Sequence, residues 1–253
     1  MTVINERREA IREFIHQKGE VLLSDLERRY PNVSSMTLRR DLYALEEEKY
    51  IKRVRSGAIA VNQVSGGEDL FGLRMRENVD AKMVIARKAA TLLEPGRALY
   101  IDSGTTNLML ARLMTDEPYN VLTSGPNIAM EVLKHAKPSI TLLGGQVSRN
   151  NVSASGHAAL AQLDDLNVDT AFIGTSGFSL GSGFTNAHQG ECDLKRKVMG
   201  KARRVVMLMD ICKLERQMPF TFAKLEAIDI LVSDVTLPED VLEAAAAAGV
   251  CVM

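Results

Sequence analysis

The sequence predicts an α/β protein with two domains, a small N-terminal one of helices and a β-hairpin and a larger one built on a parallel sheet. Two observations lead to this prediction. Residues 4–61 show apolar side chains at helical spacing and end in two short extended runs. Beyond residue 75, short apolar runs alternate with helical segments, which is typical of parallel strands buried on both faces.

Two helices are expected near the N-terminus. Apolar residues at helical spacing, with charges between them, predict a helix over 4–17, and Gly19 ends it. Ser24 is the expected N-cap of a short second helix that runs to residue 30. Pro31 cannot continue that helix, so the chain must turn there.

A third helix is expected after this turn. Ser34 or Ser35 caps it, it runs to about residue 49, and its apolar stripe comes from three leucines at 38, 42 and 45. Residues 50–55 and 58–61 are predicted strands, joined by a turn at 56–57. Three helices followed by a hairpin make a winged helix-turn-helix, whose last helix enters the major groove of DNA.

The face of the third helix opposite its leucines carries polar, basic and aromatic side chains, which suit contacts with base edges and phosphates. Arginines of the hairpin would lie beside the phosphates or the minor groove. The alternative is a solvated surface, but the turn, the leucine spacing and the basic hairpin together favour DNA. The predicted DNA-binding residues are Ser34, Ser35, Met36, Thr37, Arg39, Arg40, Tyr43, Arg53 and Arg55.

The second domain is predicted to be a Rossmann-like α/β sandwich. Residues 62–69 have the composition of a linker, so we expect domains at 1–61 and 75–253 joined by 62–74. An amphipathic helix over 79–93 opens the second domain. Seven apolar runs then predict strands at 98–102, 120–123, 139–143, 168–174, 204–210, 228–234 and 250–252.

The loop after the first of these strands has the chemistry of a phosphate site. Its residues are Asp102, Ser103, Gly104, Thr105 and Thr106. The glycine exposes backbone N–H groups, the hydroxyls add donors, and the N-terminus of the following helix favours an anion. The loop matches neither GxxxxGK[ST] nor GxGxxG, so neither a nucleoside triphosphate nor a dinucleotide follows from it.

Three further strand ends carry small or polar residues, at 123–127, 144–145 and 174–177. Ligands of open parallel sheets bind beyond the carboxyl ends of the strands, so these loops could converge on one crevice, although each alone is more often a turn. Lys213, just beyond a strand, could supply a point charge to a phosphate or a sugar hydroxyl.

Other polar residues receive no firm role. Glu191 and Lys195, at i and i+4, either pair on a helix surface or take part in the site. His157 and His188 have no partner in the sequence that would make them catalytic or metal-binding. The three cysteines lack the paired spacing of zinc or redox motifs, so we expect no metal and no cofactor.

The N-terminal motifs resemble those of a known family. Residues 33–46, VSSMTLRRDLYALE, are similar to the recognition helix of the DeoR family of bacterial transcriptional regulators, with the pattern VS-x-x-T-[IV]-RRDL-x-x-LE. The wing at 52–58, KRVRSGA, is similar to the family's RVHGGA. Arg55-Ser56 stands where the family usually has His-Gly, and YPNV at 30–33 replaces its usual phenylalanine-glycine-Val turn.

The second domain is similar to the family's sensor in five motifs: 102–106 DSGTT, 144–145 GG, 172–185 FIGTSGFSLGSGFT, 191–195 ECDLK and 210–213 DICK. After the second strand the family usually has TN-S, where this sequence has TSG at 123–125. The family's usual DSSK is replaced by DICK at 210–213. This resemblance, over nearly the whole chain, implies a sensor related to sugar-phosphate isomerases. Transferred by motif, residues 102–106, Gly144, Gly145 and Lys213 form the predicted effector site.

The resemblance implies a transcriptional repressor of a carbohydrate catabolic operon, released from double-stranded operator DNA by a phosphorylated sugar. Symmetric operators call for a homodimer or homotetramer. The chain has no apolar run of about 18 residues and no secretory leader, so we expect it in the cytoplasm and away from membranes. Activation in place of repression stays open, because the sign depends on where the operator lies.

The main rival is a sugar-phosphate isomerase or deaminase with a DNA-binding appendage. Such chemistry needs a general base beside the substrate carbons. Glu191 and Asp210 are scattered candidates, but the sequence shows no constellation around them, so we expect no catalytic residue.

Overall fold

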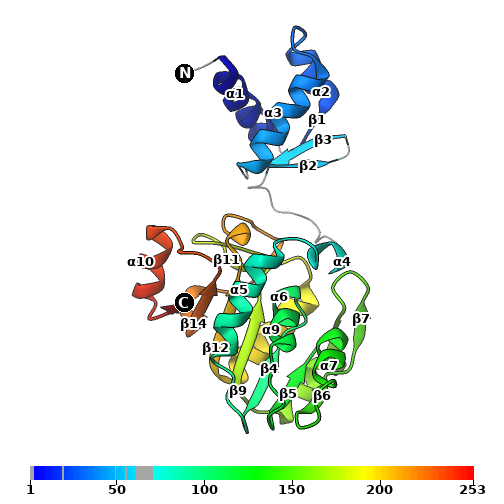
Figure 1. Ribbon diagram of the computed structural model, residues 1–253, viewed down its shortest axis with the longest axis vertical. Helices are drawn as coiled ribbons and strands as arrows, with labels where there is room; N and C mark the ends of the chain where they lie inside the picture. The colour runs from blue at the N-terminus through cyan, green and yellow to red at the C-terminus, as the bar shows by residue number, and fades with distance from the viewer. Residues whose placement is uncertain (1–2, 19, 49, 55, 61–70) are drawn as a thin grey trace. The chain divides into compact units, whose positions relative to one another are not determined.

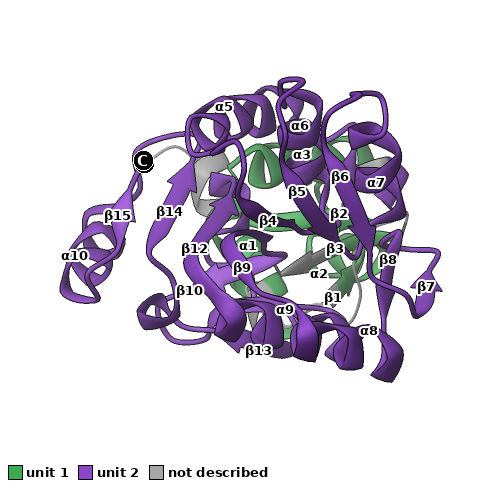
Figure 2. Ribbon diagram, turned by 90° about the horizontal axis from the view of Figure 1, so that it is seen from below, with its two compact units in different colours: residues 1–64 green, residues 65–253 purple. Residues whose placement is uncertain are grey.

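The computed structural model describes residues 3–18, 20–48, 50–54, 56–60 and 71–253. They belong to two compact units, residues 1–64 and 65–253, which Figure 2 shows in separate colours. None of the described helices has the length and apolar composition needed to cross a membrane.

The N-terminal unit is the predicted winged helix-turn-helix (Figure 1). Its sheet has the order β1-β3-β2, and the leucine stripe of the third helix is buried against the first helix. The elements are α1 (Val3–Lys18), β1 (Glu20–Leu22), α2 (Leu23–Arg29), α3 (Ser35–Glu47), β2 (Ile51–Val54) and β3 (Gly57–Ala60).

Two details of this unit differ from the prediction. The cap at Ser24 is wrong, because α2 begins two residues earlier than predicted, with Leu22 as its N-cap and the Leu22 N–H donating to Asp25 Oδ2 at 3.2 Å. Strand β1, only three residues long, is not apparent in the sequence. It pairs with β3 where Gly57 has no side chain, since a Cβ there would lie 2.0 Å from the carbonyl oxygen of Val21.

The expected linker, residues 62–74, lies mostly outside the described residues. Its last four residues form a short helix, α4 (Phe71–Arg74). The backbone N–H of Phe71 donates to the carbonyl oxygen of Asn150 at 2.8 Å, so α4 belongs structurally to the second unit.

The second unit is built on a parallel sheet of seven strands in the order β15-β14-β12-β9-β4-β5-β6. These strands confirm the seven predicted runs. They are β4 (Ala98–Ile101), β5 (Asn120–Thr123), β6 (Ser139–Leu142), β9 (Val168–Gly174), β12 (Ala202–Met209), β14 (Ile230–Ser233) and β15 (Cys251–Val252).

Helices cover both faces of this sheet (Figure 2). On one face lie α5 (Val79–Ala90), α6 (Thr105–Arg112) and α7 (Pro126–Val132), and on the other α8 (His157–Gln162) and α9 (Gln189–Lys201). The helix α10 (Glu239–Ala247) packs beside β15. The edge strand β6 is largely exposed, so the prediction that all strands are buried on both faces is wrong there.

Five short strands form two small antiparallel sheets that the sequence does not predict. They are the hairpin of β7 (Gln146–Ser148) and β8 (Ser153–Ser155), and the sheet of β10 (Gly177–Ser179), β11 (Gly183–Asn186) and β13 (Phe220–Ala223).

The strand order places a crevice at the middle of the large sheet. From β4 the chain adds β5 and β6 on one side, and then returns to add β9, β12, β14 and β15 on the other. The next helices along the chain, α6 after β4 and α9 after β9, therefore cover opposite faces of the sheet. Open parallel sheets bind ligands beyond the carboxyl ends of the strands at such a reversal, which here falls at Asp102 and Gly174.

Candidate functional site

Helix α3 presents the outward face that the sequence predicts. Met36 and Tyr43 are 79% and 52% exposed, and Arg39 and Arg40 are exposed as well. Large apolar and aromatic side chains are costly to leave in water, so a face that combines them with arginines is suited to an interface. Their contacts with DNA stay a prediction.

The hydroxyl groups at the start of α3 organise the helix itself. Ser34 is the N-cap, and its Oγ accepts a hydrogen bond from the Thr37 N–H at 3.2 Å and lies 2.9 Å from Thr37 Oγ1. Ser35 Oγ donates to Glu27 Oε1 at 2.6 Å, which ties α3 to α2. These side chains thus hold the recognition helix in place, whatever else they contact.

Asp41 is a residue of this motif that sequence reasoning did not single out. Its carboxylate is 1% exposed and accepts bonds from Arg7 Nε at 2.6 Å and Arg8 Nε at 3.1 Å. The hydrogen bond to Asp41 raises the pKa of Arg7. Because both arginines come from α1, this buried carboxylate fixes the recognition helix against the first helix.

Arg53 joins the wing to the recognition helix. Its backbone N–H and its Nε donate to the two carboxylate oxygens of Glu46, at 2.7 and 2.5 Å. Its guanidinium lies 4.6 Å from the ring centre of Tyr43. The arginine is thereby held in one orientation beside the outward face of α3. Arg55, the other predicted wing residue, lies outside the described residues.

A pocket opens at the carboxyl ends of β4 and β9. It brings together all five residues of the predicted phosphate loop and Lys213. The other lining residues are Arg74, Lys82, Asn107, Asn151, Gly174, Thr175, Ser176, Asn186, Glu191, Lys195, Leu208 and Asp210.

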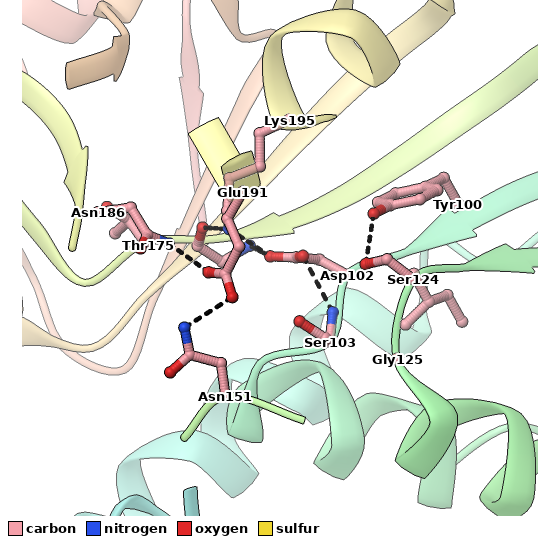
Figure 3. Close-up of polar contacts among 12 residues, drawn as sticks. Tyr100, Asp102, Ser103, Ser124, Gly125, Asn151, Thr175, Asn186, Glu191 and Lys195 are labelled. Atoms are coloured by element: carbon pink, nitrogen blue, oxygen red, sulfur yellow. Dashed lines mark hydrogen bonds and ion pairs between the residues drawn. The ribbon is translucent and has the colours of Figure 1, made fainter. Parts of the chain in front are cut away.

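A buried ion pair lies at the centre of this pocket (Figure 3). Lys195 Nζ is 2.5 Å from Asp102 Oδ2 and 2.6 Å from the carbonyl oxygen of Gly174. The Gly174 N–H donates to the same carboxylate oxygen at 3.0 Å. Helix α9 and the ends of two central strands are therefore joined through one carboxylate.

Glu191 lies one turn before Lys195 on α9 and is also buried. Its carboxylate oxygens accept hydrogen bonds from Asn151 Nδ2 at 2.6 Å and from Asn186 Nδ2 at 3.0 Å (Figure 3). The alternative that Glu191 and Lys195 merely pair on a helix surface is wrong. Sequence spacing could not show this, since Asn151 and Asp102 come from distant segments.

Helix α4 supplies another cation to the pocket. Arg74 Nη2 is 3.5 Å from Asn151 Oδ1. Lys82, 3% exposed, donates to the carbonyl oxygens of Arg74 and Glu77, the latter at 2.5 Å. Burial lowers the pKa of Lys82. The segment that leads into the second unit is thus anchored at the pocket wall.

Comparison with known proteins finds one family model in each of the two structural units. The model of the DeoR-like helix-turn-helix domain matches residues 7–64, and that of the DeoR C terminal sensor domain matches residues 77–235. The chain belongs to the DeoR family. It is therefore a DNA-binding transcriptional regulator with a C-terminal sensor domain.

The DeoR-family relatives include two named regulators of similar length. The chain is 34% identical to the HTH-type transcriptional regulator GlpR of Haloferax volcanii, over 87% of this chain and 86% of that protein. It is 31% identical to the HTH-type transcriptional repressor GlcR of Bacillus subtilis, over 90% and 88%. A solved structure of ribose 5-phosphate isomerase from Methanocaldococcus jannaschii is 18% identical, with a TM-score of 0.41 over 55% of each chain.

Two expected residues of this DeoR-family sensor lie elsewhere. The described residues that line the pocket do not include Gly144 or Gly145. The Gly144 N–H donates to Gln162 Oε1 at 3.1 Å, and Gly145 has φ +138° where a Cβ would lie 2.5 Å from the carbonyl oxygen of Ser155. The pair serves the entry into the β7–β8 hairpin, and the structure does not bring it into this pocket; its place in the effector site stays a prediction.

Two buried side chains of the DeoR-family sensor, Tyr100 and Cys192, lose their protons less readily than usual, which disfavours them as nucleophiles. Burial raises the pKa of the Tyr100 phenol well above its usual range, and that of the Cys192 thiol to about 11. Within the described ranges, no group of three or more His, Cys, Asp and Glu side chains is placed to hold a metal ion.

Proposed function

We propose that this protein represses a carbohydrate catabolic operon in the cytoplasm and that a phosphorylated sugar releases it from double-stranded operator DNA. The single observation that carries the ligand class is the start of α6. Gly104, its N-cap, has no side chain to cap the helix, and the loop from Ser103 to Thr106 lines the pocket. The first N–H groups of a helix have no partner within it, and they attract anions.

The cations around this helix start support a phosphate. Arg74, Lys195 and Lys213 line the same pocket, and Ser103, Thr105 and Thr106 add hydroxyl donors. The remaining lining is mainly polar, which suits the hydroxyl groups of a sugar. We propose residues 102–106 and Lys213 as effector-binding residues, with Arg74, Asn151, Asn186, Glu191 and Lys195 completing the site.

The sign of regulation and the assembly are also part of the proposal. The name of the relative GlcR includes the word repressor, which supports repression here. Operators with two-fold symmetry present two half-sites, so we propose a homodimer or homotetramer. Light scattering of the purified protein would give its mass.

The effector must bind the free and DNA-bound conformations with unequal affinity, because otherwise it does not shift the equilibrium between them.

We propose that the protein is not an enzyme, because each of the three carboxylates that line the pocket already accepts a hydrogen bond; Asp210 accepts one from the Cys212 N–H at 3.1 Å. Asp102 accepts bonds from Lys195 and from the Gly174 N–H, and Glu191 accepts bonds from two asparagine amides. A general base needs a free lone pair directed at the substrate. Turnover of sugar phosphates by the purified protein would overturn this part.

Operator binding is tested by a gel-shift titration at fixed salt. Arg40→Ala should weaken binding severely, because it removes a cation from the exposed face of α3. The matched control is Arg203→Ala, which removes an arginine with an 83% exposed side chain from the second unit. Equal binding by the two variants would refute the proposed DNA-binding face.

Release is tested with Thr105→Asp. A carboxylate in the phosphate loop should abolish release from DNA by sugar phosphates, through charge repulsion, and leave DNA binding in their absence intact. Thr91→Asp, at the exposed end of α5, is the control. Normal release of the Thr105 variant would place the ligand elsewhere.

A further inference from the structure

Asn107 is an unusual residue of the pocket. It lies in the first turn of α6, its side chain is 0% exposed, and it lines the pocket. Neither its Oδ1 nor its Nδ2 has a hydrogen-bond partner among the described residues. Buried amides are normally paired, because an unpaired donor or acceptor loses its bonds to water without replacement.

The space in front of this amide is left by two glycines. A Cβ on Gly174 would lie 3.4 Å from Asn107 Nδ2 and 3.5 Å from Asp102 Oδ2. A Cβ on Gly104 would have only Asn107 Nδ2 within 4 Å, at 3.8 Å, among the described atoms. The amide therefore borders the space between the phosphate loop and the Asp102–Lys195 pair.

The chemistry of the amide restricts what it can bind. It offers one donor group and one acceptor, whichever way its oxygen and nitrogen are assigned. A phosphate dianion only accepts, so it would leave the amide oxygen unpaired. A hydroxyl group both donates and accepts, and it satisfies both ends.

We infer that the Asn107 amide forms hydrogen bonds with a hydroxyl group of the ligand, next to the phosphate bound at the start of α6. This assigns to the pocket a phosphate ester that carries a hydroxyl close to the phosphate, and it makes Asn107 a specificity-determining residue. The inference rests on the proposed function, since it takes the loop at 103–106 as the phosphate site.

Isothermal titration calorimetry on the full chain tests the assignment. The probes are glycerol 3-phosphate, ribose 5-phosphate and fructose 6-phosphate, with propyl phosphate and inorganic phosphate as probes without hydroxyl groups. At least one hydroxylated ester should bind the wild type about tenfold or more tightly than propyl phosphate. In Asn107→Leu, that ratio of affinities should fall by about tenfold or more. The control is Asn120→Leu, at the amino end of β5 and not among the residues that line the pocket; it should leave the ratio of affinities unchanged.

Gly174→Ala provides a second variant, because its methyl group would occupy the space before the amide at ordinary contact distance. It should lower the same ratio. Thermal unfolding without ligand separates specificity from structure: Asn107→Leu should unfold at or above the wild-type temperature, since it removes two unpaired polar atoms. A clear drop in that temperature would show a structural role and overturn the inference.

The remaining outcomes are distinct. If phosphate and its esters bind but the ratio is unchanged in both variants, the inference fails and the proposed function stands. The inference also fails if hydroxylated esters bind no better than propyl phosphate. If no phosphate compound binds the wild type, the proposed phosphate site fails, and the inference fails with it.

Discussion

Replacing Lys195 by methionine should destabilise the sensor domain strongly. The side chains of Lys195 and Asp102 are 6% and 5% exposed, and their charged atoms lie 2.5 Å apart. Methionine keeps the length of the side chain but removes the charge, which leaves a buried carboxylate without its counter-charge. Loss of one partner of such a pair costs about 3–5 kcal/mol. That is a large part of the ~5–15 kcal/mol that stabilises a typical protein.

The same helix offers a matched control. Lys197 Nζ is 2.6 Å from Asp164 Oδ1, but these side chains are 28% and 64% exposed. Water and salt screen this pair, so Lys197→Met should cost only about 0–1 kcal/mol. Each variant carries a single Lys→Met substitution on α9. The main difference between the two ion pairs is how deeply they are buried.

Urea unfolding followed by circular dichroism measures both variants. A double variant, Lys195→Met with Asp102→Asn, should recover part of the lost stability, because it removes the unpaired charge as well. If Lys195→Met costs no more than Lys197→Met, or if Asp102→Asn adds its own full cost, the buried pair is not the stabilising element described here.

Three further predictions concern a cap and the cysteines. Ser34→Ala should lower the free energy of unfolding of the N-terminal unit by about 1 kcal/mol, because the Thr37 N–H loses its cap; unchanged thermal unfolding would contradict this. Iodoacetamide should modify exposed Cys251 in the folded protein and leave buried Cys192 intact, and equal labelling in mass spectrometry would show otherwise. Burial raises the pKa of Cys192 from 9.0 to about 11, so the unfolded chain loses that proton first. Its contribution to stability is complete below pH 9 and should fall as the pH rises towards 11, whereas Cys192→Ala should lack this component in urea titrations.

Much of the fold follows from local patterns. The leucine stripe of α3, the seven apolar strands and the loop at 102–106 are all recognised from neighbouring residues. The predictions failed where local signals are weak. Strand β1 is too short to show a period, and the N-cap of α2 is Leu22, a residue type that does not mark the start of a helix.

By itself, the sequence determined the recognition helix with its basic outward face and the sensor domain, and it predicted a phosphate site in the loop at 102–106, because periodicity and motif are properties of adjacent residues. Only the tertiary structure decided which side chains complete the pocket. Lys195 reaches Asp102 across 93 positions, and Asn151 reaches Glu191 across 40. Such contacts depend on the order of the strands in the sheet, and no spacing along the chain encodes them. The unpaired amide of Asn107 is likewise visible only when every neighbour is in place.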